Sequence, residues 1–178
     1  SSVISGTVSH ASFDAEWFAG AALADDQYGA LEEGLTAAMQ HLAKAIARDG
    51  EGATCLIEVQ VEGAVDDASA LAVARTVCGS SLVKTAVHGR DPNWGRIVAA
   101  AGRSGVKFDP EAVDLWIGGH QLMQAGQPVA FDRDAASASL REKTVLIRLL
   151  LGSGPGSGIG WGCDLSDQYV RINADYTT

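Results

Sequence analysis

The sequence is poor in basic residues and lacks long apolar runs, and each shortage excludes a class of protein. Lysine and arginine together number 13, against 22 acids, which gives a net charge of -9 and a pI near 4.7. Binding to nucleic acids and to anionic membranes depends on clustered lysine and arginine. No stretch approaches the roughly 20 apolar residues that cross a bilayer. We therefore predict no nucleic-acid partner and no membrane partner.

Cysteine is also scarce. Cys55, Cys78 and Cys163 are scattered along the chain, and an odd number leaves at least one of them unpaired. This usage suits a reducing cytosol better than a disulfide framework, so we expect a cytoplasmic protein. The spacing matches no metal-ligand pattern, so we expect buried thiols, no metal and no cofactor.

The residues that are present fit a folded domain. Apolar residues make up 47% of the chain and charged residues 20%, and 178 residues suffice for one ordinary domain or two small ones. The clearest element is a helix over residues 28–48. Its apolar side chains recur every three or four residues and predict one apolar face, made of Leu31, Leu35, Met39, Leu42 and Ile46.

Helix and strand patterns alternate along the chain. We predict helices at 13–23, 66–78, 132–141 and 166–173, a helix that begins in the polar turn 88–96, with Pro92 in its first turn, and ends at 101, and strands at 54–62, 113–117, 121–131, 144–151 and 161–165. Residues 82–87 fit either state. This order predicts an α/β fold in which residues 1–80 end one layered α/β unit and residues 81–178 form a smaller α+β domain.

Two polar segments admit both a functional and a structural interpretation. The glycine-rich stretch 152–158 could cradle a phosphate, but it matches no phosphate-binding fingerprint, so a plain strand connection is favoured. His88 and Asp91 lie in one dense polar turn. They could form an acid–base pair, or the turn could be a locally hydrogen-bonded corner.

Glu51 and the C-terminal segment suggest a site for a cation. Glu51 lies between Gly50 and Gly52 just after a helix, where small neighbours let a backbone approach a ligand closely. The C-terminal segment combines apolar anchors with Asn173 and a terminal carboxylate. If the two segments meet, they form a trap for a cationic amino acid. The alternatives are an ordinary helix-ending turn and a helix that ends on the surface.

Three long motifs resemble the β chain of the ornithine acetyltransferase family, also called the bifunctional glutamate N-acetyltransferases. They are ARDGEGAT at 47–54, LVKTAVHGRDPNWGRI at 82–97 and GCDLSDQYVRINADYTT at 162–178. The resemblance covers roughly residues 28–178, in order and with matching spacing. Three long motifs together are far more specific than any single short signature.

The resemblance implies a layered α/β/β/α sandwich, of which this chain holds part, and a compact C-terminal α+β domain. It implies acetyl transfer from N-acetylornithine to glutamate in arginine biosynthesis, with release of ornithine, and bifunctional members also use acetyl-CoA. Family members cut themselves into α and β chains, which assemble as an α2β2 heterotetramer. The family's amino-acid ligands match Glu51, Asn173 and Thr178 here.

The chain also departs from the family. The family's β chain opens with a threonine that carries the acetyl group, and residues 1–27 match that region poorly. We therefore assign no catalytic residue in this chain and expect the chain alone to be inactive. Two alternatives stay open: an amidohydrolase or aminopeptidase with Ser1 as an N-terminal nucleophile, and an inactive paralogue that only binds amino acids.

Overall fold

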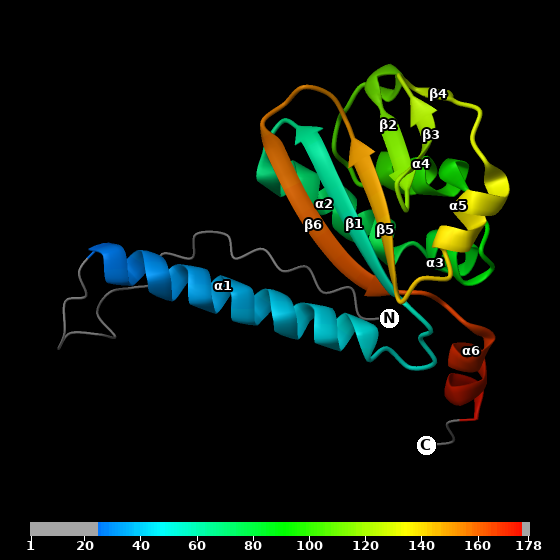
Figure 1. Ribbon diagram of the computed structural model, residues 1–178, viewed down its shortest axis with the longest axis horizontal. Helices are drawn as coiled ribbons and strands as arrows, with labels where there is room; N and C mark the ends of the chain where they lie inside the picture. Colours follow the sequence, from blue (N-terminus) through cyan, green and yellow to red (C-terminus); the bar gives the residue numbers. More distant parts are fainter. Residues whose placement is uncertain (1–24, 176–178) are drawn as a thin grey trace.

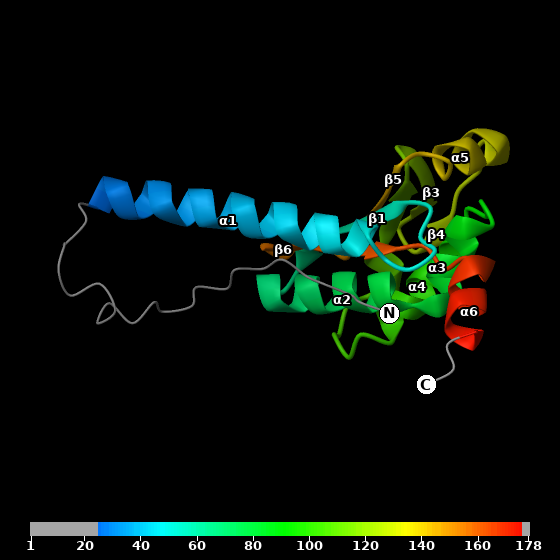
Figure 2. The same cartoon turned by 90° about the horizontal axis from the view of Figure 1, so that it is seen from below.

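The computed structural model of the chain describes residues 25–175, which form one mixed β-sheet with helices on both faces (Figures 1 and 2). The predicted α/β class is confirmed, whereas the helix predicted at 13–23 lies outside the described residues. The elements are α1 (Asp25–Arg48), β1 (Leu56–Ala64), α2 (Asp67–Gly79), α3 (Ser81–His88), α4 (Trp94–Gly102), the 3-10 helix η2 (Pro110–Ala112), β2 (Asp114–Ile117), β3 (His120–Gln124), β4 (Gln127–Pro128), α5 (Arg133–Ser139), β5 (Thr144–Leu150), β6 (Gly156–Cys163) and α6 (Asp167–Ala174).

The sheet joins strands from both halves of the chain. Its strand order is β4-β3-β2-β5-β1-β6, with β1 parallel to β5 and antiparallel to β6. The division predicted at residue 80 falls between α2 and α3. It stays a prediction, and it would have to separate β1 from two strands to which β1 is hydrogen-bonded.

The main core lies between this sheet and the helices α2, α3 and α4 (Figure 2). Alternate residues of β1 face these helices, as the period-two pattern predicts, and Ile57, Val59 and Val61 are fully buried there. The helix α2 begins where the sequence predicts, because the side chain of Asp66 accepts a hydrogen bond from the backbone N–H of Ser69. Each such buried aliphatic side chain stabilises the fold by about 1.5–3 kcal/mol.

Gly156 and Gly158, which fall in the stretch 152–158 predicted to connect two strands, belong instead to strand β6. Gly156, Gly158, Gly160 and Gly162 alternate along the strand, and their hydrogen atoms face α2. A Cβ added at Gly158 would lie 2.6 Å from the backbone nitrogen of Leu71. The glycine spacing of two therefore permits direct contact between strand and helix backbones, and the prediction of a plain strand connection was wrong from residue 156 onward.

The opposite face of the sheet receives α1, through a side of that helix other than its predicted apolar face. Ala43 and Ala47 pack against Leu56 and Trp161. The predicted apolar face, which we call the α1 stripe (Leu31, Leu35, Met39, Leu42 and Ile46), is 43–58% exposed. The helical period was predicted correctly. Within the described chain this face lies exposed, and the small residues Ala43 and Ala47 make the contact with the sheet instead.

Residues 82–87, which the sequence left undecided, lie in the short helix α3. Among the described residues, no single helix has both the length and the apolarity to cross a membrane. The pair α2 and α3, bent by 59°, meets the criteria of length and composition only when the two are taken together. Their apolar residues belong to the core described above.

Candidate functional site

A pocket of about 410 Å³ lies where the end of α1, the turn after it, helix α3, the end of β6 and helix α6 meet. Its lining includes three acids, Asp49, Glu51 and Asp164, and one base, Lys84. Glu51 and Asp49 are exposed, whereas Lys84 and Asp164 are buried. The pocket thus has acids at its mouth and buried charges deeper inside.

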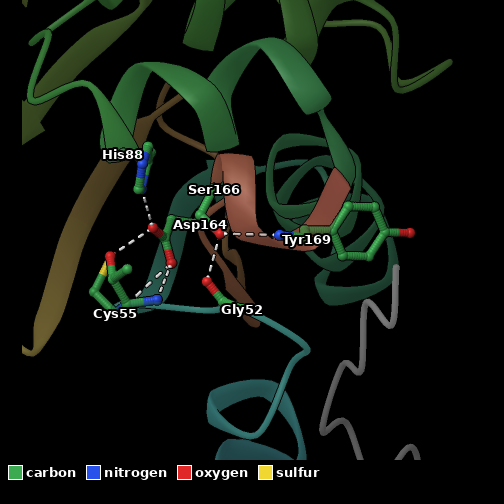
Figure 3. A network of polar contacts seen from close by, with 7 residues as sticks. Gly52, Cys55, His88, Asp164, Ser166 and Tyr169 are labelled. Carbon is green, nitrogen blue, oxygen red and sulfur yellow. Dashed lines mark hydrogen bonds and ion pairs between the residues drawn. The ribbon is translucent and has the colours of Figure 1, made fainter. Parts of the chain in front are cut away.

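The turn after α1 is fastened to the start of α6. The hydroxyl of Ser166 donates to the carbonyl oxygen of Gly52 at 2.6 Å, and it accepts from the backbone N–H of Tyr169 at 3.3 Å (Figure 3). Gly52 has φ +67°, and a Cβ on it would lie 2.7 Å from the Tyr169 nitrogen. Ser166 therefore caps α6 and holds the turn against it, and Gly52 is required for both the conformation and the contact.

The second glycine of the turn has a similar role. A Cβ at Gly50 would lie 2.6 Å from the sulfur of Cys163 at the end of β6. The sequence interpretation assigned the two glycines to close approach of a ligand. In the structure they allow close packing of the turn against β6 and α6, and this packing places Glu51 at the pocket.

The structure brings two of the three predicted site residues together. The side-chain amide of Asn173 donates to Glu51 Oε2 at 2.9 Å, from positions 122 residues apart in the chain. The third predicted residue, Thr178, lies outside the described residues. Helix α6 and the glycine turn therefore converge on one pocket, as the cation-trap argument requires.

The orientation of the Asn173 amide follows from its two acceptors. Its Nδ2 group donates to Glu51 Oε2 and also to the carbonyl oxygen of Tyr169, each at 2.9 Å. Both amide hydrogens are then used, and Oδ1 remains as an acceptor. Among the described residues no hydrogen bond to Asn173 Oδ1 or to Glu51 Oε1 is recorded. The pair therefore offers acceptors only, which suits an ammonium group.

Asp164 is the centre of a second polar network, which the sequence analysis missed. Its Oδ1 accepts from the backbone N–H groups of Thr54 at 2.7 Å and Cys55 at 3.1 Å. Its Oδ2 accepts from the Thr54 hydroxyl at 2.6 Å and contacts His88 Nδ1 at 2.8 Å (Figure 3). Burial raises the pKa of Asp164, but the hydrogen bonds from Thr54, His88 and Cys55 outweigh it and hold the pKa below its usual range.

This network corrects the partner proposed for His88. Asp91 accepts from Asn93 at 2.9 Å and pairs with Arg133 at 2.8 Å, whereas His88 pairs with Asp164. The polar turn is thus the hydrogen-bonded corner of the structural interpretation, and the carboxylate of Asp164 orients the His88 ring from 76 residues away. The one sequence signal for Asp164 was its place in the third family motif.

Cys55, which contacts this network, and Cys78 are not activated as nucleophiles. Burial and the nearby Asp164 charge raise the pKa of the Cys55 thiol to about 12, and burial raises that of Cys78 to about 12. Both thiols therefore stay protonated at neutral pH. All three cysteines, which lie within the described part of the chain, are free. Cys78 and Cys163 are buried as predicted, and Cys55 is half-buried.

Comparisons with known proteins agree on one family. The family model described as "ArgJ family" matches residues 7–178. The match therefore begins earlier in the chain than the motif resemblance, which covers roughly residues 28–178. Similar curated proteins are the "Arginine biosynthesis bifunctional protein ArgJ" of Parasynechococcus marenigrum, 77% identical over 160 residues (90% of this chain, 39% of that protein), and its namesake in Prochlorococcus marinus strain MIT 9313, 67% identical over 169 residues (90% of this chain, 40% of that protein).

A solved structure shares the fold as well. The crystal structure of the arginine biosynthesis bifunctional protein argJ from Bacillus halodurans is 44% identical, with a TM-score of 0.84, over 90% of this chain and 77% of that chain. This confirms the layered α/β fold predicted from the motifs. The chain spans about two fifths of the length of the two curated relatives.

Proposed function

This chain belongs to the ArgJ family, and we propose that it builds part of the amino-acid pocket of an acetyltransferase in arginine biosynthesis. The proposed reaction transfers acetyl from N-acetylornithine to glutamate and releases ornithine, with acetyl-CoA as a further donor in bifunctional members. The nucleophile is a threonine outside this chain. Glu51, Asn173 and Thr178 bind the amino-acid substrate, and the enzyme works in the cytoplasm.

The observation that carries this proposal is the acceptor pair formed by Glu51 and Asn173. The free side-chain ammonium of N-acetylornithine has three N–H donors. The open oxygens of the pair, Glu51 Oε1 and Asn173 Oδ1, are acceptors, and Glu51 supplies the charge. The pocket volume of about 410 Å³ lies within the range typical of small-molecule sites.

The exposed α1 stripe is an argument for a partner chain. Leu31, Leu35, Met39, Leu42 and Ile46 lie along one side of a helix that projects past the sheet (Figure 1). A continuous exposed apolar face of this kind marks an interaction surface. Because the curated relatives are more than twice as long as the match, we propose that the other part of the family's polypeptide covers the stripe, as the α chain of an α2β2 assembly.

A reconstitution experiment tests the proposed reaction. We expect this chain alone to transfer no acetyl, and we expect turnover from N-acetylornithine to glutamate when it is co-purified with the part of the Parasynechococcus relative that lies outside the match. The double variant L35E/M39E places two charges in the stripe, and it should prevent co-purification. The matched variant Q40E/H41E on the same helix should not.

Several outcomes would contradict the proposal. Turnover by the chain alone, or release of free acetate without glutamate, would favour the amidohydrolase alternative. Ornithine binding without turnover in the reconstituted complex would favour the inactive paralogue. Co-purification of L35E/M39E at wild-type yield would show that the α1 stripe does not contact the partner chain.

Glu51→Gln tests the ammonium-binding role separately. The substitution keeps the shape and the contact with Asn173 but removes the negative charge. We expect KM for N-acetylornithine to rise about tenfold, because hydrogen bonds to charged groups are roughly twice as strong as neutral ones. Glu111→Gln, at an exposed acid on η2, is the matched control. Steady-state kinetics on the reconstituted enzyme measures both, and an unchanged KM in Glu51→Gln would exclude this role.

A further inference from the structure

Lys84 brings an ammonium group to the pocket, and no contact within the described part of the fold engages that group. It lies on α3, is 4% exposed and lines the pocket. Within residues 25–175 its ammonium group makes no hydrogen bond and no ion pair. The side chain is buried along its length, but no buried polar side-chain atom among the described residues lacks a hydrogen-bond partner, so the unpaired ammonium of Lys84 is reached by solvent through the pocket.

The backbone of Lys84 is fixed in place. Its carbonyl oxygen accepts from the backbone N–H of Leu165 at 3.3 Å, which ties α3 to the segment between β6 and α6. The hydroxyl of Ser80 caps the same helix by accepting from the Val83 N–H. The backbone of Lys84 is therefore held beside the pocket by the hydrogen bond from Leu165 and by the cap at the start of α3.

The nearby acids do not neutralise Lys84. Both oxygens of Asp164 are already engaged by Thr54, Cys55 and His88. Glu51 and Asp49 are exposed at the mouth, and Glu51 contacts Asn173. Tyr169 and Asn173 of α6, which also line the pocket, are uncharged. The pocket thus separates its charges, with acceptors for a cation at the mouth and an ammonium beneath them.

We infer that Lys84 binds a carboxylate of the amino-acid substrate. This inference rests on the proposed function for the identity of the ligands, and it gives the pocket two opposite ends that match the two charges of an amino acid. The ammonium group of Lys84 donates to the carboxylate, which supplies the acceptor that no described residue of the chain provides. Glu51 and Asn173 bind the cationic group of the same molecule.

The carboxylate has two possible sources, which kinetics separate. N-acetylornithine and glutamate share an α-carboxylate, whereas only glutamate has a side-chain carboxylate. The test variant is Lys84→Met, which keeps an unbranched side chain as far as the ε position and removes the charged nitrogen. The matched control is Lys107→Met, at an exposed lysine. The reconstituted enzyme is assayed with each substrate varied in turn.

We expect Lys84→Met to raise KM about tenfold or more, while Lys107→Met leaves it unchanged. A rise for both substrates identifies the α-carboxylate, and a rise for glutamate alone identifies the side-chain carboxylate. Thermal unfolding serves as the check on folding. Because the ammonium is accessible from the pocket and its removal breaks no contact within the described fold, the Tm of Lys84→Met should stay close to that of the wild type.

A second measurement does not depend on turnover. Glutamate is titrated into the isotopically labelled wild-type chain, and the NMR signals of the lysine ε-methylene groups are followed, with the Lys84 signal assigned from its loss in Lys84→Met. A saturating shift at Lys84 supports the inference even if acetyl transfer fails. Unchanged KM for both substrates together with no shift at Lys84, in an enzyme that turns over, would overturn the inference and leave the proposed function intact.

Discussion

Gly158→Ala is expected to destabilise the chain by about 1–3 kcal/mol, and Gly158→Val by more, because a side chain at this position overpacks the core. The added Cβ would lie 2.6 Å from the nitrogen and 2.9 Å from the Cα of Leu71, both of which are backbone atoms of α2. A flexible side chain could turn aside, but a helix backbone can only shift as a unit. The shift would disturb the contacts of α2 with β1 and α4.

The matched control is Gly102→Ala, in the last turn of α4. No heavy atom lies within 4 Å of a Cβ built at Gly102, and the residue is helical. There we expect alanine to stabilise the chain by up to about 1 kcal/mol through helix propensity. Urea unfolding measures both variants. Equal stability of Gly158→Ala and the wild type would show that α2 moves away from β6 without cost, and that the glycine face is not required.

Sequence patterns predicted which segments form helices and strands better than they predicted which elements pack against one another. The period of three to four over Leu31–Ile46 correctly indicated α1, but periodicity alone does not show which face of a helix the chain itself covers. The small residues Ala43 and Ala47 pack on the sheet instead. In β6 the glycines carry no side chain, so the period-two signal that identifies a strand was weak. The glycine-rich segment is a strand because it is hydrogen-bonded to β1, and this pairing is not visible in the local sequence.

The candidate site was predictable only in part, because local sequence does not show which distant residues meet. Glu51 and Asn173 stood out because each had an unusual local context, and the structure places them in contact. Lys84 and Asp164 did not, since a lysine in an amphipathic segment and an aspartate after a strand look ordinary in sequence. The importance of Asp164 comes from burial and from partners 76 to 110 residues away, and that of Lys84 comes from its place in the pocket, which only the folded chain brings about.

Asp164→Ala is expected to destabilise the chain by about 3 kcal/mol, because it leaves the donors of Thr54, Cys55 and His88 without their shared acceptor. The Asp164 side chain is completely buried, so water replaces it poorly. Asp164→Asn keeps one carbonyl oxygen for the backbone donors but presents an N–H group where Asp164 Oδ2 accepts from the Thr54 hydroxyl. We expect it to lose about half as much stability and to let the turn before β1 move, with Glu51 on it.

The pH dependence of stability separates the charge of Asp164 from its shape. The pKa of Asp164 is depressed in the folded chain, so its contribution is complete above the usual aspartate value near 4 and is lost as the pH falls through the folded-state pKa. Urea unfolding at pH 7 should show the full difference between wild type and Asp164→Asn. That difference should shrink below about pH 4. A difference that stays constant down to pH 2.5 would show that the hydrogen bonds act without the carboxylate charge, and that the network holds the pocket by geometry alone.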